Sequence, residues 1–143
     1  MVKVELSRMD DAYHMVATND RGNIIHIDEK VEAGGKGAGF GPMQSLLAAL
    51  GGCSTIDVVS ILKKQRQPLE DIKITVTGER EPNATPSLYQ TVHAHFKLFG
   101  KIDKDKAEKA VALSVEKYCS VAMTLRKSGA KVTHSFEIIG DRK

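Results

Sequence analysis

The chain has 143 residues, of which 41% are hydrophobic and 27% charged, and this length predicts one domain, residues 1–143, with its own core. The formal net charge of +3 and the scattered basic residues argue against a nucleic-acid-binding protein. No apolar run approaches the ~20 residues of a membrane span, and the start lacks the apolar core of a signal peptide, so we expect a cytoplasmic protein without membrane contact.

The first part of the chain predicts a three-stranded meander. Apolar and polar residues alternate over residues 2–6, a second strand covers about 12–18, and a third covers 24–28 after the turn at 19–23. The glycine-rich stretch 33–39 fits neither the Walker pattern nor a dinucleotide-binding fingerprint, so we interpret it as a mobile loop that leads into the next helix.

Residues 41–68 predict one long central helix. Gly41 suits the N-cap, Pro42 suits the first helical position, and basic residues precede Pro68, which ends the helix. Apolar residues cover most of its circumference, and such a helix is usually buried. We therefore expect the rest of the fold to wrap around it.

The remaining chain predicts two strands, a helix and a last strand. Residues 72–76 and 92–98 alternate as two strands of a hairpin. A helix starts at the N-cap Asp103 and continues towards Lys127, with a break left open, and a strand follows at 132–138. This order predicts the α+β class and not the regular alternation of a doubly wound sheet.

Cys53 and Cys119 have two interpretations that the residues alone leave open. A free cysteine is often simply a small buried hydrophobic residue. Alternatively, one thiolate attacks the O–O bond of a peroxide, and the resulting sulfenic acid condenses with the second thiol. Gly51 and Gly52 favour the second interpretation, because they would let another backbone approach Cys53 as closely as a disulfide requires.

The sequence resembles the OsmC/Ohr family, the osmotically inducible and organic hydroperoxide resistance proteins, and within it the YhfA-like branch. Two segments carry the resemblance, GPMQSLLAALGGCSTIDVVSIL around the first cysteine and EKYCSVAMTLRKSGAKVTHSFEI around the second. The resemblance implies an OsmC-like fold in which antiparallel sheets wrap a long buried central helix. It also implies an intertwined homodimer.

The resemblance further implies a thiol peroxidase that reduces organic or other hydroperoxides. Cys53 matches the peroxidatic cysteine and Cys119 the resolving cysteine of the family. A dithiol, such as a dihydrolipoyl protein, would reduce the resulting disulfide. The resemblance implies no cofactor, so that no metal, haem or flavin is expected.

The sequence departs from the family at the residues that support the thiolate. The family carries a glutamate ten positions before the first cysteine and an arginine from the N-terminal sheet, whereas here Met43 is followed by Gln44. Gln44 can accept a hydrogen bond or cap the helix, but it cannot form a charge-assisted pair. Arg8, Arg21 and Arg80 are candidate guanidinium donors, and we keep Gln44 and Arg80 as the supporting residues.

Other polar side chains have simpler interpretations. His93 and His95 have a spacing that could chelate a metal ion, but a polar face of a strand is the favoured reading, and His134 alternates with apolar residues like a partly buried core histidine. Asp57 lies one helical turn after Cys53, where a carboxylate could orient a neighbour but would disfavour a thiolate.

Two alternatives to the peroxidase remain. The rival is a protein of the same fold with inert thiols, which holds a small apolar ligand at the dimer interface. The helix start without a carboxylate favours this rival, whereas the presence of both cysteines favours the enzyme. A third possibility is a redox sensor in which Cys53 is oxidised slowly without turnover.

Overall fold

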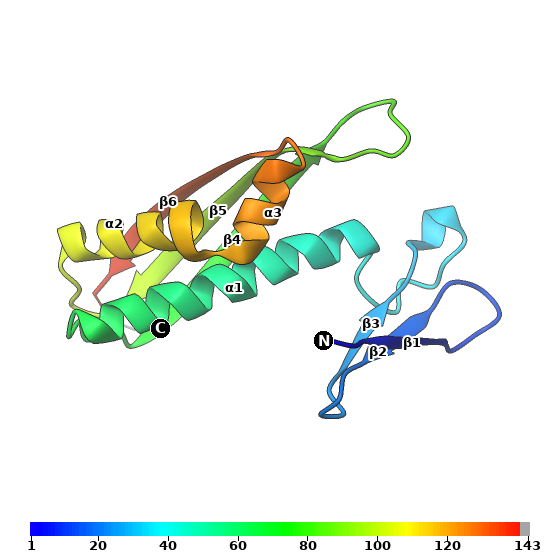
Figure 1. Ribbon diagram of the computed structural model, residues 1–143, viewed down its shortest axis with the longest axis horizontal. Helices are drawn as coiled ribbons and strands as arrows, with labels where there is room; N and C mark the ends of the chain where they lie inside the picture. Colours follow the sequence, from blue (N-terminus) through cyan, green and yellow to red (C-terminus); the bar gives the residue numbers. More distant parts are fainter. Residues whose placement is uncertain (141–143) are drawn as a thin grey trace. The chain divides into compact units, whose positions relative to one another are not determined.

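A computed structural model describes residues 1–140 and has the α+β class expected from the sequence (Figure 1). The chain divides into two compact units, Met1–Leu46 and a second unit that begins at Leu47. The expectation of one domain stays a prediction. In chain order the elements are β1 (Glu5–Arg8), β2 (Met15–Thr18), β3 (Ile24–Ile27), the 3-10 turn η1 (Val31–Ala33), α1 (Pro42–Lys64), β4 (Asp71–Arg80), β5 (Tyr89–Phe99), α2 (Lys104–Leu113), the π-helical turn η2 (Ser114–Tyr118), α3 (Ser120–Lys127) and β6 (Lys131–Ile139).

The first unit contains the predicted meander, with β1, β2 and β3 paired antiparallel in that order. The strands are shorter than predicted, because β1 begins at Glu5 and β2 at Met15. The side-chain oxygen of Asn19 closes the turn by accepting hydrogen bonds from the backbone N–H groups of Arg21 and Asn23.

The glycine-rich stretch, which we expected to be a mobile loop, is held by hydrogen bonds. The buried carboxylate of Asp28 accepts from the backbone N–H groups of Glu29, Lys36 and Ala38. A Cβ at Gly39 would collide with the carbonyl group of His26, so this close approach requires glycine. A short polar side chain and a close backbone contact therefore order a segment whose composition is typical of flexible loops.

The second unit is built on the sheet β4-β5-β6. The predicted hairpin is confirmed, because β4 and β5 pair antiparallel from Asp71↔Phe99 to Arg80↔Tyr89. The expectation of antiparallel sheets is wrong for β6, which pairs with β5 in parallel, Thr91 opposite Lys131. The physical reason is the connection, since parallel neighbours need a long crossover and α2, η2 and α3 supply it.

The helices of the second unit cover one face of this sheet. Its central strand β5 presents Val92, Ala94, Phe96 and Leu98 to the core, all at most 1% exposed. Gly51 brings α1 onto β4, where an added Cβ would lie 3.4 Å from a methyl group of Val76. Both α2 and α3 contact β6, and in Figure 1 α2 runs along α1 while α3 stands at a steep angle to it.

The other face of the sheet is polar, as predicted for His93 and His95. The His93 ring lies 2.7 Å from the Thr133 hydroxyl and 2.8 Å from that of Ser135. The His95 ring lies 2.7 Å from the Ser135 hydroxyl and 3.4 Å from the carboxylate of Glu137. These contacts form a ladder of side-chain hydrogen bonds between β5 and β6.

His134 is partly buried, as predicted, and its Nε2 lies 3.6 Å from the carboxylate of Glu116. It belongs to the apolar side of β6, where the register places it opposite Ala94. The position therefore fits a core histidine with one acidic neighbour rather than a partner for a thiol.

The central helix α1 ends earlier and is less covered than predicted. It ends at Lys64 instead of reaching Pro68, and Arg66 has a left-handed backbone with φ of 57°. Its buried residues form a single stripe, Leu50, Gly51, Ser54, Val58 and Leu62. Burial all round is wrong for the single chain, because Ile56 on another face is 71% exposed.

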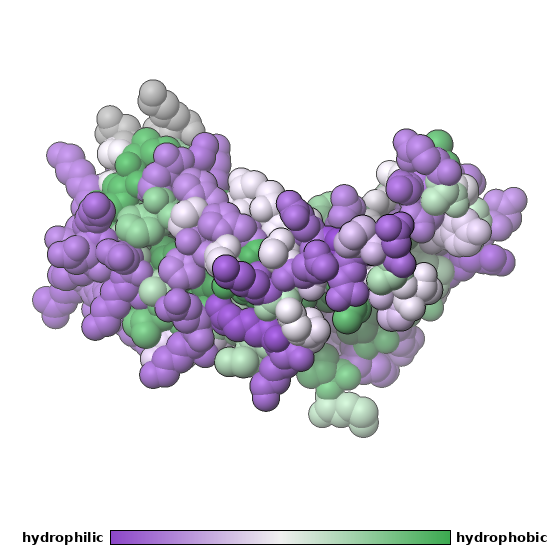
Figure 2. All heavy atoms as spheres, turned by 90° about the horizontal axis from the view of Figure 1, so that it is seen from above, coloured by the Kyte–Doolittle hydropathy of each residue, from purple (hydrophilic) through white to green (hydrophobic). Residues whose placement is uncertain are grey.

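The length and composition of α1 also match those of a membrane-spanning helix, and the expectation of a protein without membrane contact stays a prediction. An 18-residue window of α1 has a mean hydropathy of 1.7, and only 28% of that window is buried. Core helices of soluble proteins have the same length and hydropathy. Figure 2 shows a face on which hydrophilic side chains predominate, with hydrophobic groups in patches between them.

Candidate functional site

The structure brings Cys53 and Cys119 together, although 65 residues separate them in the sequence. The two Sγ atoms and a carboxylate oxygen of Asp57 all lie within 4.8 Å of one another. Cys53 and Asp57 lie one turn apart on α1, whereas Cys119 lies between η2 and α3. We call this group the thiol cluster.

A break in the second helix places Cys119 in the thiol cluster. The α-helix α2 passes into the π-helical turn η2, and Cys119 then has an extended backbone with φ of −72° and ψ of 107°. Its backbone N–H donates to the carbonyl of Ser114 over 2.8 Å. Its Sγ accepts from the backbone N–H of Ala122 over 3.4 Å, so the sulfur caps α3. These bonds fix the sulfur relative to both helical segments.

Ser114 links η2 to α1 at the thiol cluster. Its side chain is fully buried, and its Oγ lies 3.0 Å from the carbonyl oxygen of Ser54 and 3.2 Å from Oδ2 of Asp57. A buried hydroxyl must find an acceptor, and here the two acceptors belong to the facing helix. Ser114 therefore sets the position of Asp57 and the spacing of the two segments that carry the thiols.

Arg126 holds η2 against α3. Its Nη1 donates to the carbonyl oxygen of Val115 over 2.6 Å, and the residue is half-buried. A π-helical turn leaves carbonyl groups out of the regular helical ladder, and a guanidinium is a strong donor for such a group. Arg126 thus stabilises the turn that leads to Cys119.

The two thiols differ in accessibility. Cys119 is 2% exposed, and this burial raises the pKa of its thiol from 9.0 to about 11, against a lowering by the N–H of Ala122. Interaction with Cys53 adds to the rise. Cys119 is consequently protonated at neutral pH, whereas Cys53 is half-buried and can be reached from solvent.

The two supporting residues expected from the sequence have backbone partners. Oε1 of Gln44 accepts from the N–H of Gly41 over 2.9 Å, so the capping alternative is the one the structure shows. Nε of Arg80 donates to the carbonyl of Ser87 over 3.1 Å, within the connection between β4 and β5. Their role in supporting Cys53 stays a prediction.

Sequence reasoning missed Ser114 and Arg126. Ser114 reads as one polar residue inside an amphipathic helix, and no local pattern marks its bond to a helix 60 positions away. Arg126 reads as favourable charge in the last turn of a helix. The possible helix break was the one signal for these residues, because an irregular turn leaves backbone groups that side chains must satisfy.

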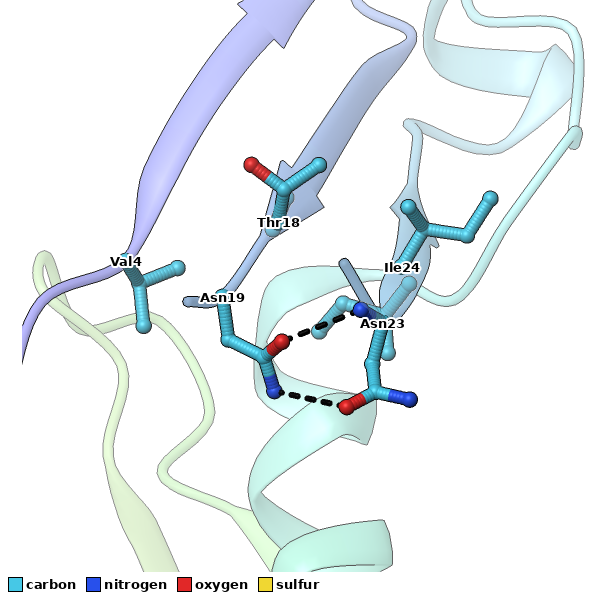
Figure 3. Close-up of a pocket in the computed structure, with 7 residues that line it drawn as sticks. Val4, Thr18, Asn19, Asn23 and Ile24 are labelled. Carbon is cyan, nitrogen blue, oxygen red and sulfur yellow. Dashed lines mark hydrogen bonds between the residues drawn. The ribbon is translucent and has the colours of Figure 1, made fainter. Parts of the chain in front are cut away.

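A separate hollow of about 140 Å³ lies in the first unit, at the end of β2 and β3 (Figure 3). The side chains of Asn19 and Asn23 are bonded to each other over 3.2 Å beside it, and Val4 and Ile24 line it. None of its lining residues is titratable. The hollow therefore offers apolar surface but no group for chemistry, unlike the thiol cluster.

Comparison with known proteins gives consistent matches. The family described as OsmC-like protein matches residues 34–135. Protein YhfA of Escherichia coli K12, whose name states no activity, is 48% identical over 99 residues, which cover 68% of this chain and 72% of that protein.

Solved structures agree with this match. A hypothetical protein from Aquifex aeolicus VF5 is 33% identical with a TM-score of 0.84, covering 99% of this chain and 98% of that one. An organic hydroperoxide resistance protein OsmC from Legionella pneumophila has a TM-score of 0.73 at 18% identity, covering 96% of both chains. At that identity the second likeness shows the fold alone.

Proposed function

Because the chain belongs to the OsmC-like protein family, we propose that it is a cysteine-based reductase of organic or other hydroperoxides, acting as a homodimer in the cytoplasm. The single observation that carries this proposal is the convergence of Cys53 and Cys119 within 4.8 Å. The name of the Legionella pneumophila neighbour, an organic hydroperoxide resistance protein, agrees with this choice of substrate.

In the first step the thiolate of Cys53 attacks the O–O bond of the peroxide. An S–O bond forms, the O–O bond breaks, and the leaving alkoxide takes a proton to become an alcohol. Cys53 is thereby oxidised to a sulfenic acid while the peroxide is reduced. The exposure of Cys53 supports its choice over the buried Cys119.

In the second step the sulfur of Cys119 attacks the sulfenic sulfur of Cys53. The S–S bond forms, the S–O bond breaks, and the hydroxide that leaves takes the thiol proton of Cys119 to become water. The two sulfurs, which lie within 4.8 Å of each other, must approach to about 2.05 Å to form this bond.

In the third step a dithiol such as a dihydrolipoyl protein reduces the disulfide. One thiolate attacks a sulfur of the disulfide to form a mixed disulfide, and the second thiol then releases both protein thiols and the oxidised donor. Over the cycle, one peroxide and one dithiol give an alcohol, water and a disulfide. We infer attack at Cys53, because it is the more accessible sulfur.

Exposed apolar residues close to the two cysteines in the sequence support an organic peroxide. Tyr118 directly precedes Cys119 in the sequence and is 52% exposed, and Ile56 on α1 is 71% exposed. Such side chains would contact the hydrocarbon part of a substrate or of a second subunit. The rates with cumene hydroperoxide and with hydrogen peroxide distinguish an organic substrate from hydrogen peroxide.

One observation favours the rival function, in which the thiols are inert and the fold binds a small apolar ligand at the dimer interface. Asp57 places a carboxylate beside both thiols, whereas the neighbour that activates a nucleophilic cysteine is a cation.

The test is consumption of hydrogen peroxide and of cumene hydroperoxide with dithiothreitol or dihydrolipoamide as donor. We expect turnover in the unmodified protein and none in Cys53→Ser. In the absence of the dithiol donor, Cys119→Ser should react once, forming a sulfenic acid that dimedone traps. Ser60→Ala, at an exposed position of the same helix, is the matched control and should keep full activity. Equal inactivity of all four proteins would overturn the reductase in favour of the rival.

A further inference from the structure

We propose that the reduced thiol cluster of Cys53, Asp57 and Cys119 is also a binding site for a thiophilic divalent cation of the zinc class. The proposal uses the side chains of the proposed reductase but does not depend on peroxide turnover. It is carried by three ligand atoms of the right chemistry within 4.8 Å of one another.

The distances fit one ion. Zinc binds thiolate sulfur at about 2.3 Å and carboxylate oxygen at about 2.0–2.2 Å, so ligand atoms around a tetrahedral ion lie about 3.5–3.8 Å apart. The cluster is within about 1 Å of this spacing before any ion enters, and small rotations of the three side chains would close the gap. Three protein ligands leave the fourth position to water or to a small ligand.

The surroundings provide the hydrogen bonds that orient metal ligands. The Ser114 hydroxyl lies 3.2 Å from Oδ2 of Asp57, and the Ala122 N–H bonds the sulfur of Cys119. Such outer contacts hold ligating side chains in place and raise metal affinity. Two sulfur ligands select soft or borderline ions over magnesium and calcium, which prefer oxygen.

Other clusters on the described chain are weaker candidates. His14 and His26 are bonded to each other over 2.9 Å, but they offer only two ligands. His93, His95 and Glu137 are strung along the sheet through Ser135 rather than gathered around one point. The thiol cluster therefore has the geometry that the histidines lack.

Cation binding and disulfide formation exclude each other. Binding converts two thiols to thiolates and releases two protons, and the ion then shares the electron pairs that a disulfide would need. Oxidation by a hydroperoxide removes two electrons from the sulfur pair and leaves no thiolate ligand. The cation would consequently protect the reduced state, and oxidation would release it.

The experiment uses the full chain, reduced and treated with a chelator, and titrates it with Zn²⁺ or with Co²⁺ as a coloured probe. We expect one ion per chain, release of protons on binding, and a sulfur-to-cobalt charge-transfer band. Asp57→Asn should weaken binding by about tenfold or more, and Cys53→Ser or Cys119→Ser should abolish the charge-transfer band or reduce it by half. His95→Ala is the control for the histidine ladder and should bind like the unmodified protein.

Binding that persists unchanged in Cys53→Ser or in the peroxide-oxidised protein would overturn the proposal, as would no binding to the reduced protein. Circular dichroism of each variant shows whether it is folded, and Cys53→Ala gives a second variant at the same position. Peroxide turnover is measured separately in the presence of chelator. Turnover without cation binding refutes only the cation site, and cation binding without turnover refutes only the reductase.

Discussion

At the scale of single residues, two chemically identical side chains have different environments. Cys119 is buried and caps α3 with its sulfur, whereas Cys53 is half-buried on α1. Burial disfavours the charged form of a thiol, so Cys119 keeps its proton at neutral pH. Cys53, in contrast, is accessible to solvent. This asymmetry divides the proposed roles, since a first nucleophile must be reached by the substrate and a second one need only reach the first.

The asymmetry predicts a pH-dependent stability. The pKa of Cys119 is about 11 in the folded chain and 9.0 ordinarily, so the unfolded chain loses this proton first as the pH rises. The free energy of unfolding should therefore fall by about 2 kcal/mol between about pH 9 and about pH 11. Urea unfolding of the reduced protein measures it.

Cys119→Ala is the control for this pH dependence, because lysines titrate in the same range in both proteins. Its stability should fall less over the same pH interval. If the free energy of unfolding fell equally with pH in both proteins, the pKa of Cys119 would not be raised by folding.

Which residues could be recognised from the sequence follows from how local their signals are. Cys53 and Cys119 stand out because cysteine is rare in the chain and their flanking segments resemble a known family. Gln44 was recognisable as a cap because its partner Gly41 is three positions away. Ser114 was not, because its hydroxyl meets Asp57 only after two distant helices have packed.

At the scale of elements, the π-helical turn η2 decides where the second thiol lies. It interrupts the helix so that Cys119 becomes the N-cap of α3 instead of one more residue on a helical face. Such turns are uncommon and occur often at functional sites. Arg126 compensates one of the carbonyl groups that the interruption leaves without a regular partner.

We predict that Arg126→Met slows disulfide formation at the thiol cluster and lowers the free energy of unfolding by about 1–3 kcal/mol. The change keeps most of the aliphatic stem but removes the charge-assisted donor to Val115. The measurements are urea unfolding of the reduced protein and the rate at which free thiols disappear after one equivalent of peroxide.

Lys127→Met is the matched control for Arg126, because it removes a neighbouring positive charge from an exposed position. It should leave both quantities nearly unchanged. If the two variants behaved alike, the effect would come from the charge of the helix end and not from support of η2.

The elements themselves were largely predictable, and the errors have identifiable causes. Alternation of apolar residues correctly indicated β4 and β5, and Asp103 correctly indicated the start of α2, where its side chain accepts from the N–H of Lys106. The parallel pairing of β6 is not encoded in a local pattern, because alternation looks the same in both directions. The order of the glycine-rich segment depends on Asp28, whose bonds reach Ala38.

At the scale of the whole molecule, the single chain leaves large apolar side chains exposed on α1. Ile56 is 71% exposed and Val59 38% exposed, on a helix whose composition is that of a core helix. Exposed apolar surface of this kind marks an interface. The proposed homodimer would cover it and would explain why a helix that reads as fully buried is buried along one stripe only.

We predict that Ile56→Asp converts the proposed homodimer to a monomer while the single chain stays folded. The side chain is mostly exposed in the single chain, so a charge there costs the monomer little, whereas a dimer interface would have to bury it unpaired. Sedimentation equilibrium gives the mass, and circular dichroism reports the fold.

Lys109→Asp, at an exposed position of α2, is the control for introducing an aspartate and should remain dimeric. A monomeric unmodified protein would rule out the homodimer. If the Ile56→Asp variant were still a dimer, the interface would lie on another surface.

The parallel pairing of β5 with β6 also has a consequence for how the chain is made. Thr91 of β5 pairs with Lys131 of β6, so the ribosome adds 40 further residues before the edge of β5 that faces β6 can be paired. During that interval β4 and β5 form a two-stranded sheet, and the unpaired edge of β5 is a template for pairing with another chain. Nascent chains released before Lys131 would therefore expose this edge of β5, and synthesis through β6 is the step that pairs it.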